Sequence, residues 1–287
     1  MELLLTHEVP VRTAVFLLVL VAMALWEAAV PRRRRELPRL LRWSGNLGLV
    51  VVDALVVRAV LPLLAVGVAA LAEARGFGLL PALGLPRPLA VLAAVVLLDL
   101  TVYLQHVLFH AVPALWRLHR VHHADPEFDT TTGVRFHPVE ILLSMLLKMA
   151  VAGALGAPPE AVVLFEILLN ASSLFNHANL ALPPRVDRWL RRVIVTPDMH
   201  RVHHSVHPDE HHRNFGFALS IWDRLFGTYR AQPRDGHERM VLGLRIFRDP
   251  AEQRLDRLVT QPFRRPAGRA PTLLGEADGG RRSLTQG

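Results

Sequence analysis

The sequence predicts an all-α fold, in which a multi-pass bundle of transmembrane helices carries a histidine-rich helical cap. Hydrophobic residues make up 51% of the 287 residues, and several apolar runs are long enough to cross a bilayer. The pentapeptide His-Arg-Val-His-His also occurs twice, at residues 119–123 and 200–204. The first observation predicts the membrane helices, and the second predicts a metal-binding cap.

Five apolar runs account for the membrane part. In chain order they cover residues 11–30, 47–72, 88–110, 139–156 and 159–182. The last two are separated by so short a linker that we expect them to form a helical hairpin. The first run could also be a cleaved signal peptide, but the arginines at 32–35 follow it at once, which indicates a retained membrane anchor.

The same arginines predict the orientation of the chain. Positively charged loops stay on the cytoplasmic side of a membrane, so we expect residues 31–46 there and the loop 73–87 on the opposite side. Both pentapeptides then lie on the cytoplasmic face. The sequence therefore predicts an integral, multi-pass protein with a cytosolic histidine site, and its Ala-, Leu- and Arg-rich composition favours a bacterial inner membrane.

Three parts can be distinguished along the chain. Residues 1–46 are expected to form an N-terminal membrane anchor and a basic cytoplasmic segment, and residues 47–230 the histidine-bearing membrane domain. Proline, arginine and glycine dominate residues 231–287, which predicts a basic, disordered tail.

The net charge is +8, but the basic residues cluster beside apolar runs, where contact with membrane lipids explains them. No nucleic-acid motif accompanies them, so nucleic acid is not an expected partner.

Nine histidines are the candidate metal ligands. Residues three and four apart share one face of a helix, so each pentapeptide is expected to present three imidazoles to one point. An isolated histidine is usually an ordinary core or surface residue, but a repeated triplet beside an i, i+4 pair favours a metal site. The full set is His106, His110, His119, His122, His123, His177, His200, His203 and His204.

Four further polar residues could orient a ligand or add one. Asp99 and Tyr103 continue the stripe of His106 and His110 along one face of a helix, and polar groups at membrane depth usually face a functional interior. His137 lies in Arg-Phe-His-Pro-Val-Glu, and Asn179 follows His177 by two positions. Metal-bound imidazoles commonly need such a hydrogen-bonding partner.

The chain contains no cysteine, which excludes thiolate nucleophiles, iron–sulfur clusters and Cys-bound zinc. It also lacks the His-Glu-x-x-His motif of metalloproteases and the Glu-x-x-His pairs of carboxylate-bridged diiron bundles. Imidazole binds iron, copper, zinc and nickel. Because nine ligands exceed the needs of one ion, two ions are expected, and the spacing does not name the element.

The histidine pattern resembles the three histidine boxes of the fatty acid hydroxylase / sterol desaturase superfamily. The boxes correspond to residues 106–110, 119–123 and 200–204, and Phe-Asn-His-Ala-Asn at 175–179 and Asn-Phe-Gly at 214–216 are further matches. The resemblance covers about residues 45–230. It implies a four-helix membrane bundle and two irons bound by the nine histidines. Some members have a tenth histidine where this chain has Ser173, so water or His137 would substitute there.

The resemblance also implies a function. Members of the superfamily hydroxylate or desaturate a lipid, such as a fatty acyl chain or a sterol, with dioxygen and external electrons. The chain has no dinucleotide-binding motif and no haem or iron–sulfur domain, so a separate ferredoxin, cytochrome or reductase is an expected partner. Two alternatives stay open: a redox-inert membrane hydrolase, since zinc can occupy such sites on isolation, and a non-catalytic metal-binding or transport protein.

Overall fold

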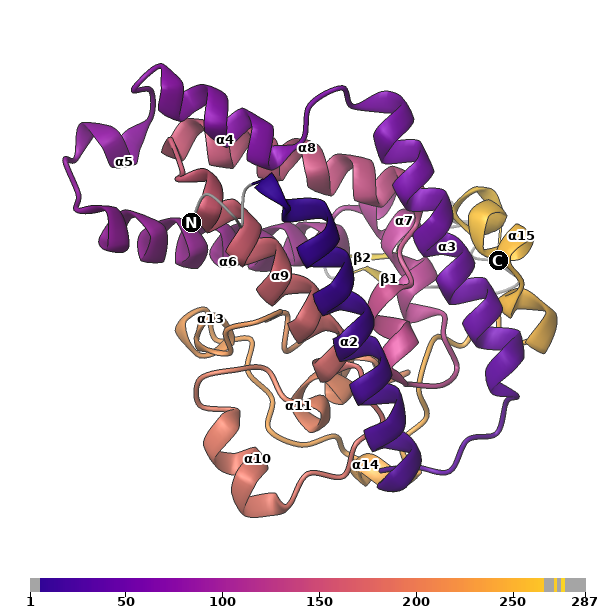
Figure 1. Cartoon of the computed structure of the whole chain (residues 1–287). Coiled ribbons are helices and arrows are strands. Elements are labelled where there is room, and N and C mark those ends of the chain that lie inside the picture. The colour runs from indigo at the N-terminus through magenta and orange to yellow at the C-terminus, as the bar shows by residue number, and fades with distance from the viewer. Residues whose placement is uncertain (1–5, 266–270, 273–274, 277–287) are drawn as a thin grey trace, which may run out of the picture.

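The computed structural model describes residues 6–265, 271–272 and 275–276, and most of them are helical (Figure 1). Four segments are long and apolar enough to cross a membrane. They are α2 (Glu8–Ala29), the segment Arg39–Ala82, α6 (Arg87–Ala111) and α8 (Pro138–Leu155). The predicted all-α, multi-pass fold is confirmed.

The segment Arg39–Ala82 is not one straight helix. It contains α3 (Arg39–Val60), α4 (Ala65–Ala74) and α5 (Leu79–Ala82). Pro62 lacks a backbone N–H and disfavours the helical conformation at the residue before it, and Leu61 is accordingly extended. The apolar run 47–72 therefore folds as two helices instead of one span.

One more long helix, α9 (Pro159–Asn176), packs against α2, α4 and α6. α8 and α9 each pack on α4 and α6 more than on each other, so they do not pair as the expected hairpin. The shorter elements are α7 (Pro113–His123), η1 (Thr130–Val134), α10 (Pro184–Leu190), α11 (Pro197–His203), α12 (Pro208–His211), α13 (Ile221–Leu225), α14 (Gly236–Arg239), η2 (Pro250–Gln253), α15 (Leu255–Thr260), η3 (Gln261–Phe263) and the antiparallel strands β1 (Pro271–Thr272) and β2 (Gly275–Glu276).

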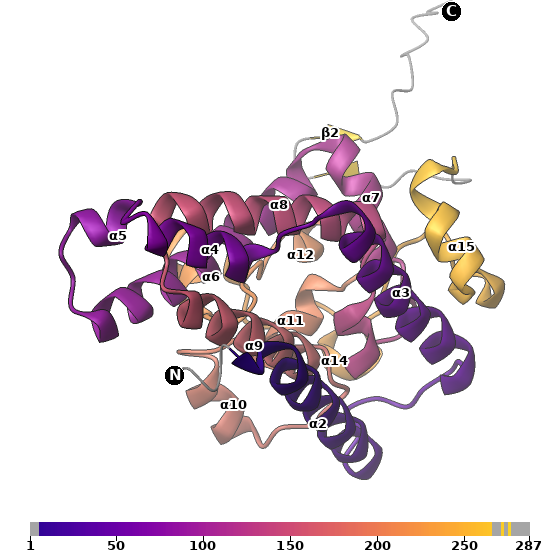
Figure 2. The same cartoon turned by 45° about the horizontal axis from the view of Figure 1, so that its top comes forward.

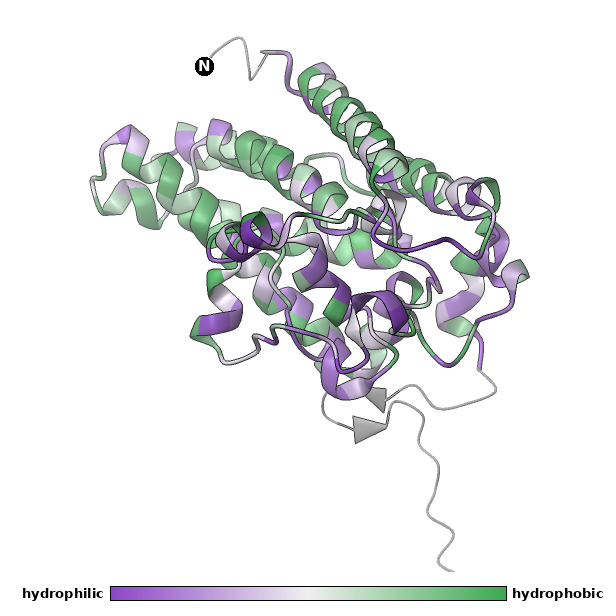
Figure 3. Cartoon of the chain, turned by 90° about the horizontal axis from the view of Figure 1, so that it is seen from below, coloured by the Kyte–Doolittle hydropathy of each residue, from purple (hydrophilic) through white to green (hydrophobic). Residues whose placement is uncertain are grey.

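Small residues form the centre of the helix bundle. Ala65 and Ala69 of α4, Ala94 of α6, Ala152 of α8 and Ala161 of α9 have no exposed surface. Alanine lets helix backbones approach closely, and van der Waals contact of this kind drives helix association in lipid. Other, larger apolar side chains of these helices, such as Leu92, Leu146 and Leu164, are exposed, and a bilayer would cover them. Figure 3 shows these hydrophobic residues along the long helices and hydrophilic residues concentrated in the shorter elements.

The long helices contact the histidine-bearing segments at one end of the bundle. The carboxylate of Glu27, near the end of α2, accepts hydrogen bonds from the backbone N–H groups of Thr130 and Asn179. Arg42, in the first turn of α3, pairs with Asp125 just after the first pentapeptide. The bundle therefore has a histidine-bearing end, and the linker between α8 and α9 lies at the opposite end.

The prediction of a disordered tail is wrong for residues 231–265. α15 packs on α3, where Leu258 is fully buried against Leu49 and Val121 (Figure 2). The side chain of Gln253 and the guanidinium of Arg135 form a buried hydrogen bond of 2.6 Å. Composition concealed this segment because its apolar residues stand in short groups of at most three among arginines and prolines. Most of the remaining tail lies outside the described residues.

The C-terminal segment crosses the cap at Gly243. Its backbone N–H donates to the carbonyl oxygen of His204 (3.0 Å), its φ is +82°, and a Cβ there would lie 2.6 Å from the carbonyl oxygen of Asp125. Gly243→Ala is expected to destabilise the protein by about 1–3 kcal/mol, measured as thermal unfolding in detergent. Gly236→Ala is the matched control, since Gly236 has φ +70° but no neighbouring atom within 4 Å. Equal losses in the two variants would contradict the steric explanation.

Candidate metal centre

The nine predicted histidines converge into two groups, and each group has one ring nitrogen per residue within 4.8 Å of the others. The groups combine residues from α6, α7, the end of α9 and the α11 region. One contains five residues, His106, His110, His119, His123 and His203; the other contains four, His122, His177, His200 and His204. The five-histidine group and the four-histidine group are thus the two halves of one buried cluster.

Each pentapeptide contributes to both groups, so the expectation that its three imidazoles point to one place is wrong. His119 and His123 join the five-histidine group, whereas His122 joins the four-histidine group. In the second copy, His203 joins the five-histidine group, whereas His200 and His204 join the four-histidine group. An α-helix turns about 100° per residue, so residues i and i+4 are about 40° apart while i+3 lies on the other side of residue i.

Unsatisfied nitrogens inside the cluster fit a metal. The Nε2 atoms of His106 and His203 lie 3.0 Å apart, and Nε2 of His177 lies 3.0 Å from that of His200 and 3.2 Å from that of His122. Nε2 of His110, His119 and His123 and both ring nitrogens of His204 are buried without a hydrogen-bond partner. Buried polar atoms are normally satisfied, and a cation in each group would satisfy these.

Backbone carbonyls fix the tautomer of three of the rings. Nδ1 of His106 lies 2.8 Å from the carbonyl oxygen of Phe215, and Nδ1 of His203 lies 2.7 Å from that of Arg213. Nδ1 of His177 makes the same contact with Ser173 (2.8 Å). A carbonyl oxygen only accepts, so the proton stays on Nδ1 and the Nε2 lone pair faces the other histidines.

The cap histidines are held in the neutral form that binds metals. Burial lowers the pKa of His119 to about 3. The pKa of His177 is also lowered to about 3, mainly by burial, although the hydrogen bond to the carbonyl oxygen of Ser173 opposes the shift. Burial likewise lowers the pKa of His122, His200 and His204 well below the usual value, and adjacent histidines add to the effect. Protonation near neutral pH therefore does not compete with a metal ion.

Residues 91–228, which include all nine histidines, match the protein family described as fatty acid hydroxylase. This part of the chain is a fatty acid hydroxylase domain, as found in the fatty acid hydroxylase/sterol desaturase superfamily. It is similar to an ornithine lipid hydroxylase of Rhizobium tropici, with 30% identity over 149 residues, which are 52% of this chain and 44% of that protein. No solved structure matches the chain.

Two other relatives have different substrates in their names. An alkylglycerol monooxygenase of Homo sapiens is 27% identical over 153 residues, or 51% of this chain and 31% of that protein. A cholesterol 25-hydroxylase of Rattus norvegicus is 27% identical over 166 residues, or 57% of this chain and 53% of that protein. The chain thus spans about half or less of the length of these relatives.

Glu140 is a residue of this hydroxylase domain that sequence reasoning did not single out. Its Oε1 lies 2.6 Å from Nδ1 of His119, and both side chains are buried. A carboxylate in this position accepts the Nδ1 proton, orients the ring and makes its Nε2 a better metal ligand. Glu140 occupies the first turn of α8, 21 positions from His119. The only sequence signal was its place in the motif Arg-Phe-His-Pro-Val-Glu.

Glu140→Gln is expected to weaken metal binding by the five-histidine group about 10- to 100-fold, because the amide loses the charge that orients His119. The measurement is metal retained per chain against a graded series of a competing chelator. Glu160→Gln is the matched control, since Glu160 is also a buried carboxylate near a helix start but pairs with Arg87. Identical retention curves for wild type and Glu140→Gln would refute the orienting role.

The four residues predicted to orient or supplement the ligands have hydrogen-bond partners outside the set of nine histidines. The carboxylate of Asp99 accepts from the indole N–H of Trp222, and the hydroxyl of Tyr103 pairs with that of Thr228. Nε2 of His137 lies 3.0 Å from the carbonyl oxygen of Val259, and the side chain of Asn179 bonds the backbone of Arg33. Within the described ranges, no hydrogen bond joins any of the four to one of the nine histidines. Their ligand role stays a prediction, and the observed contacts favour a packing role.

Two more histidines lie against the five-histidine group. Nδ1 of His212 lies 3.3 Å from Nδ1 of His110, and the ring of His211 stacks on Trp116 with 5.6 Å between centroids. The predicted ligand set did not include them, since the stretch around them is polar and typical of a loop. α12 brings it to the cluster, and two adjacent histidines beside an Asn-Phe-Gly motif were the available signal.

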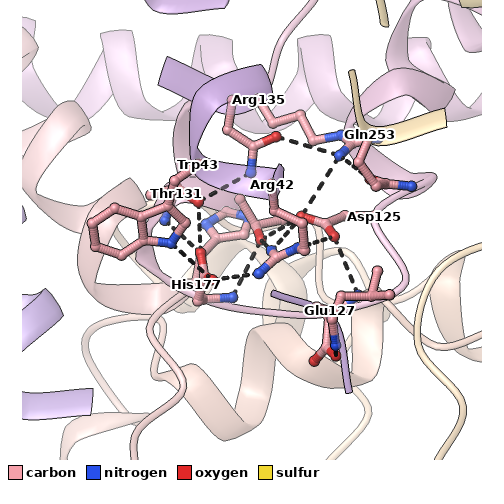
Figure 4. Close-up of polar contacts among 12 residues, drawn as sticks. Arg42, Trp43, Asp125, Glu127, Thr131, Arg135, His177 and Gln253 are labelled. Atoms are coloured by element: carbon pink, nitrogen blue, oxygen red, sulfur yellow. Dashed lines mark hydrogen bonds and ion pairs between the residues drawn. The ribbon is translucent and has the colours of Figure 1, made fainter. Parts of the chain in front are cut away.

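A buried ionic network supports the loop after the first pentapeptide. Arg42 forms a two-pronged ion pair with Asp125 (2.6 and 2.8 Å) and also binds Asp129 (Figure 4). Burial alone would raise the pKa of Asp125, but Arg42 and Arg135 lower it to about 2. Thr132 completes the contacts by donating to Asp125 (2.9 Å). The network attaches α3 to the loop that holds His122 and His123 in place.

Proposed function

We propose that this chain is a membrane-bound oxygenase that hydroxylates or desaturates a lipid with dioxygen and external electrons. The observation that carries the proposal is the pair of buried histidine groups at one end of an apolar helical bundle. Neutral imidazoles bind a redox metal without adding negative charge, and the chain's relatives are named lipid hydroxylases and monooxygenases. That the substrate is a lipid is part of this proposal, because the chain covers only part of the length of those relatives.

We propose that the five-histidine group and the four-histidine group each hold one iron ion. Bound iron would supply the redox chemistry that activates dioxygen toward a C–H bond. The protein's own contribution is to exclude water and to hold the imidazoles in fixed orientation, through the carbonyls of Phe215, Arg213 and Ser173 and the carboxylate of Glu140. Zinc bound on isolation would occupy the same nitrogens.

The four-histidine group has one ligand fewer than the five-histidine group. Ser173 occupies the position where some members of the superfamily have a further histidine. The carbonyl oxygen of Ser173 contacts Nδ1 of His177, while its hydroxyl donates to the carbonyl oxygen of Gly133 (2.5 Å). His137 is engaged at the start of α8 and by Val259. A water molecule is therefore the better proposal for the additional position than His137.

The site is proposed to face the cytoplasm, where a separate ferredoxin, cytochrome or reductase would deliver electrons. The arginine run supports this orientation because it lies beside the site. The guanidinium of Arg33 donates to the carbonyl oxygens of His237 and Met240, and its backbone N–H donates to Asn179. By the positive-inside rule the arginine-rich side is cytoplasmic. The exposed arginines on this side would favour an acidic donor protein.

The activity can be tested with isotopically labelled oxygen. Membranes that contain the chain are incubated with ¹⁸O₂, a reductase and ferredoxin, and the lipids are analysed by mass spectrometry. Lipids that carry one ¹⁸O, or that have lost two hydrogens, are expected only with the wild-type chain. A variant with His177→Ala provides the inactive control. Unchanged lipids in both samples, from iron-loaded protein and with a range of bacterial and sterol lipids supplied, would overturn the proposal.

A further inference from the structure

The carboxylate of Asp99 holds a distant segment against a spanning helix. It accepts hydrogen bonds from the backbone N–H groups of Ala218 (3.3 Å) and Leu219 (3.2 Å) and from the indole of Trp222 (2.8 Å). Asp99 precedes His106 by seven residues, which is about 10 Å along α6. Because α6 is a candidate membrane span, residues 218–222 extend from the histidine cluster back toward the bilayer.

α10 and α13 are joined into one surface at this depth. The backbone N–H of Val195 donates to the carbonyl oxygen of Ala218 (3.0 Å), and that of Ser220 donates to the carbonyl oxygen of Val193 (3.0 Å). The guanidinium of Arg224 reaches the carbonyl oxygen of Arg191 (2.6 Å). These hydrogen bonds hold the two short helices together as one unit, which we call the anchor surface (residues 184–194 and 218–226).

Large apolar side chains protrude from the anchor surface. Trp189 and Leu225 are each 66% exposed, and the other exposed members are Val186, Val193, Ile221 and Phe226. An apolar patch of this kind on a protein surface marks a membrane or protein contact. Tryptophan in particular is enriched at the boundary between headgroups and acyl chains.

Exposed charge on the anchor surface is positive. Its exposed arginines are Arg185, Arg188, Arg192 and Arg224, and the guanidinium of Arg192 stacks over the Trp189 ring at 4.1 Å. The acidic residues of the same segments, Asp187 and Asp223, are buried and engaged by Thr196 and by backbone N–H groups. Apolar side chains bordered by arginines are the pattern of elements that lie in an anionic membrane interface.

We propose that the anchor surface lies in the plane of the membrane and binds an anionic phospholipid headgroup layer. The hydrogen bonds to Asp99 favour lipid over a partner protein, because they place the surface beside a helix that is itself a candidate membrane span. The anchor also reaches the histidines. Phe215 lies just before the second half of the anchor surface. The centroid of its ring lies 5.5 Å from the ring centroids of His106 and His203. Headgroup binding would therefore help to hold Phe215 against the histidine cluster.

The absence of cysteine allows a direct test, because each single-cysteine variant carries one spin label. Trp189→Cys and Leu225→Cys report on the anchor surface, and Glu238→Cys, on the 74% exposed side chain of α14, is the control. The full-length chain is reconstituted into vesicles of phosphatidylcholine with and without phosphatidylglycerol. Collision rates of each label with oxygen and with a water-soluble nickel chelate are then measured by electron paramagnetic resonance.

The oxygen-to-nickel collision ratio is expected to be at least about threefold higher at positions 189 and 225 than at 238, and to rise further with phosphatidylglycerol. Arg188→Gln combined with Arg192→Gln should remove that rise. Labels at 189 and 225 that are as accessible to nickel as the control would overturn the proposal. Shielding that appears only after an acidic ferredoxin is added would overturn it too, in favour of a protein-docking surface. The readout needs no turnover, so it is independent of the proposed function.

Discussion

Replacing His122 and His200 together by alanine is expected to remove one of two metal ions per chain and to lower activity at least about 100-fold. These residues come from different pentapeptides but belong to the same four-histidine group. Only His177 and His204 would remain there, which is too few ligands for a stable site. The five-histidine group would be intact, so the second ion should stay bound. Metal content per chain after gel filtration in detergent measures the effect.

A second double variant, His122→Ala with His123→Ala, is the matched comparison. It removes two histidines of the same pentapeptide, but one from each group. Three ligands would remain in one group and four in the other, so we expect both ions to bind more weakly and neither to be lost selectively. His207→Ala is a neutral control, because His207 pairs with Asp235 outside the cluster. Loss of one ion from the same-pentapeptide variant alone would contradict the observed division of the histidines.

Arg42→Met is expected to destabilise the protein by about 3–5 kcal/mol, because it removes the cation that pairs directly with both buried carboxylates and leaves only the more distant Arg135 near Asp125. For a domain of this size the midpoint of thermal unfolding should fall by roughly 10 °C. The loop that carries these aspartates follows His123 directly, so metal content should fall as well. Differential scanning fluorimetry in detergent and metal analysis of the same sample measure the two effects.

Arg58→Met is the matched control, since Arg58 is an exposed arginine on the same helix α3. Its replacement should change the unfolding midpoint little. Arg42→Lys keeps the charge but cannot bind Asp125 with two parallel hydrogen bonds, so an intermediate loss is expected. An unfolding midpoint for Arg42→Met equal to that of the wild type would show that the network contributes nothing to stability.

Local spacing explains why so much of the site could be predicted. The nine histidines are recognisable because their i, i+3 and i+4 intervals are properties of single helices, and the structure does bring all nine together. Their division into two groups depends on how α6, α7 and α11 face one another, which no interval along the chain contains. For the same reason Glu140 was missed, because its contact with His119 joins two helices.

Composition was a weaker guide than spacing. The apolar runs predicted the membrane bundle, but residues 231–265 were assigned to a disordered tail on their proline and arginine content. Their order depends on single contacts made over long sequence distances, such as Leu258 on Val121 and Gln253 on Arg135. Asp99 and Tyr103 were correctly identified as buried polar residues of α6, but their partners, Trp222 and Thr228, lie more than 100 positions away.

Metal content combined with Mössbauer spectroscopy tests the central claim most directly. The chain is produced with ⁵⁷Fe, purified in mild detergent and analysed without added metal. Two neutral imidazole groups predict about two irons per chain, with two quadrupole doublets because the groups have five and four histidines. Stoichiometric zinc without iron, persisting after iron-replete and zinc-poor growth, would contradict the oxygenase account and favour a redox-inert enzyme.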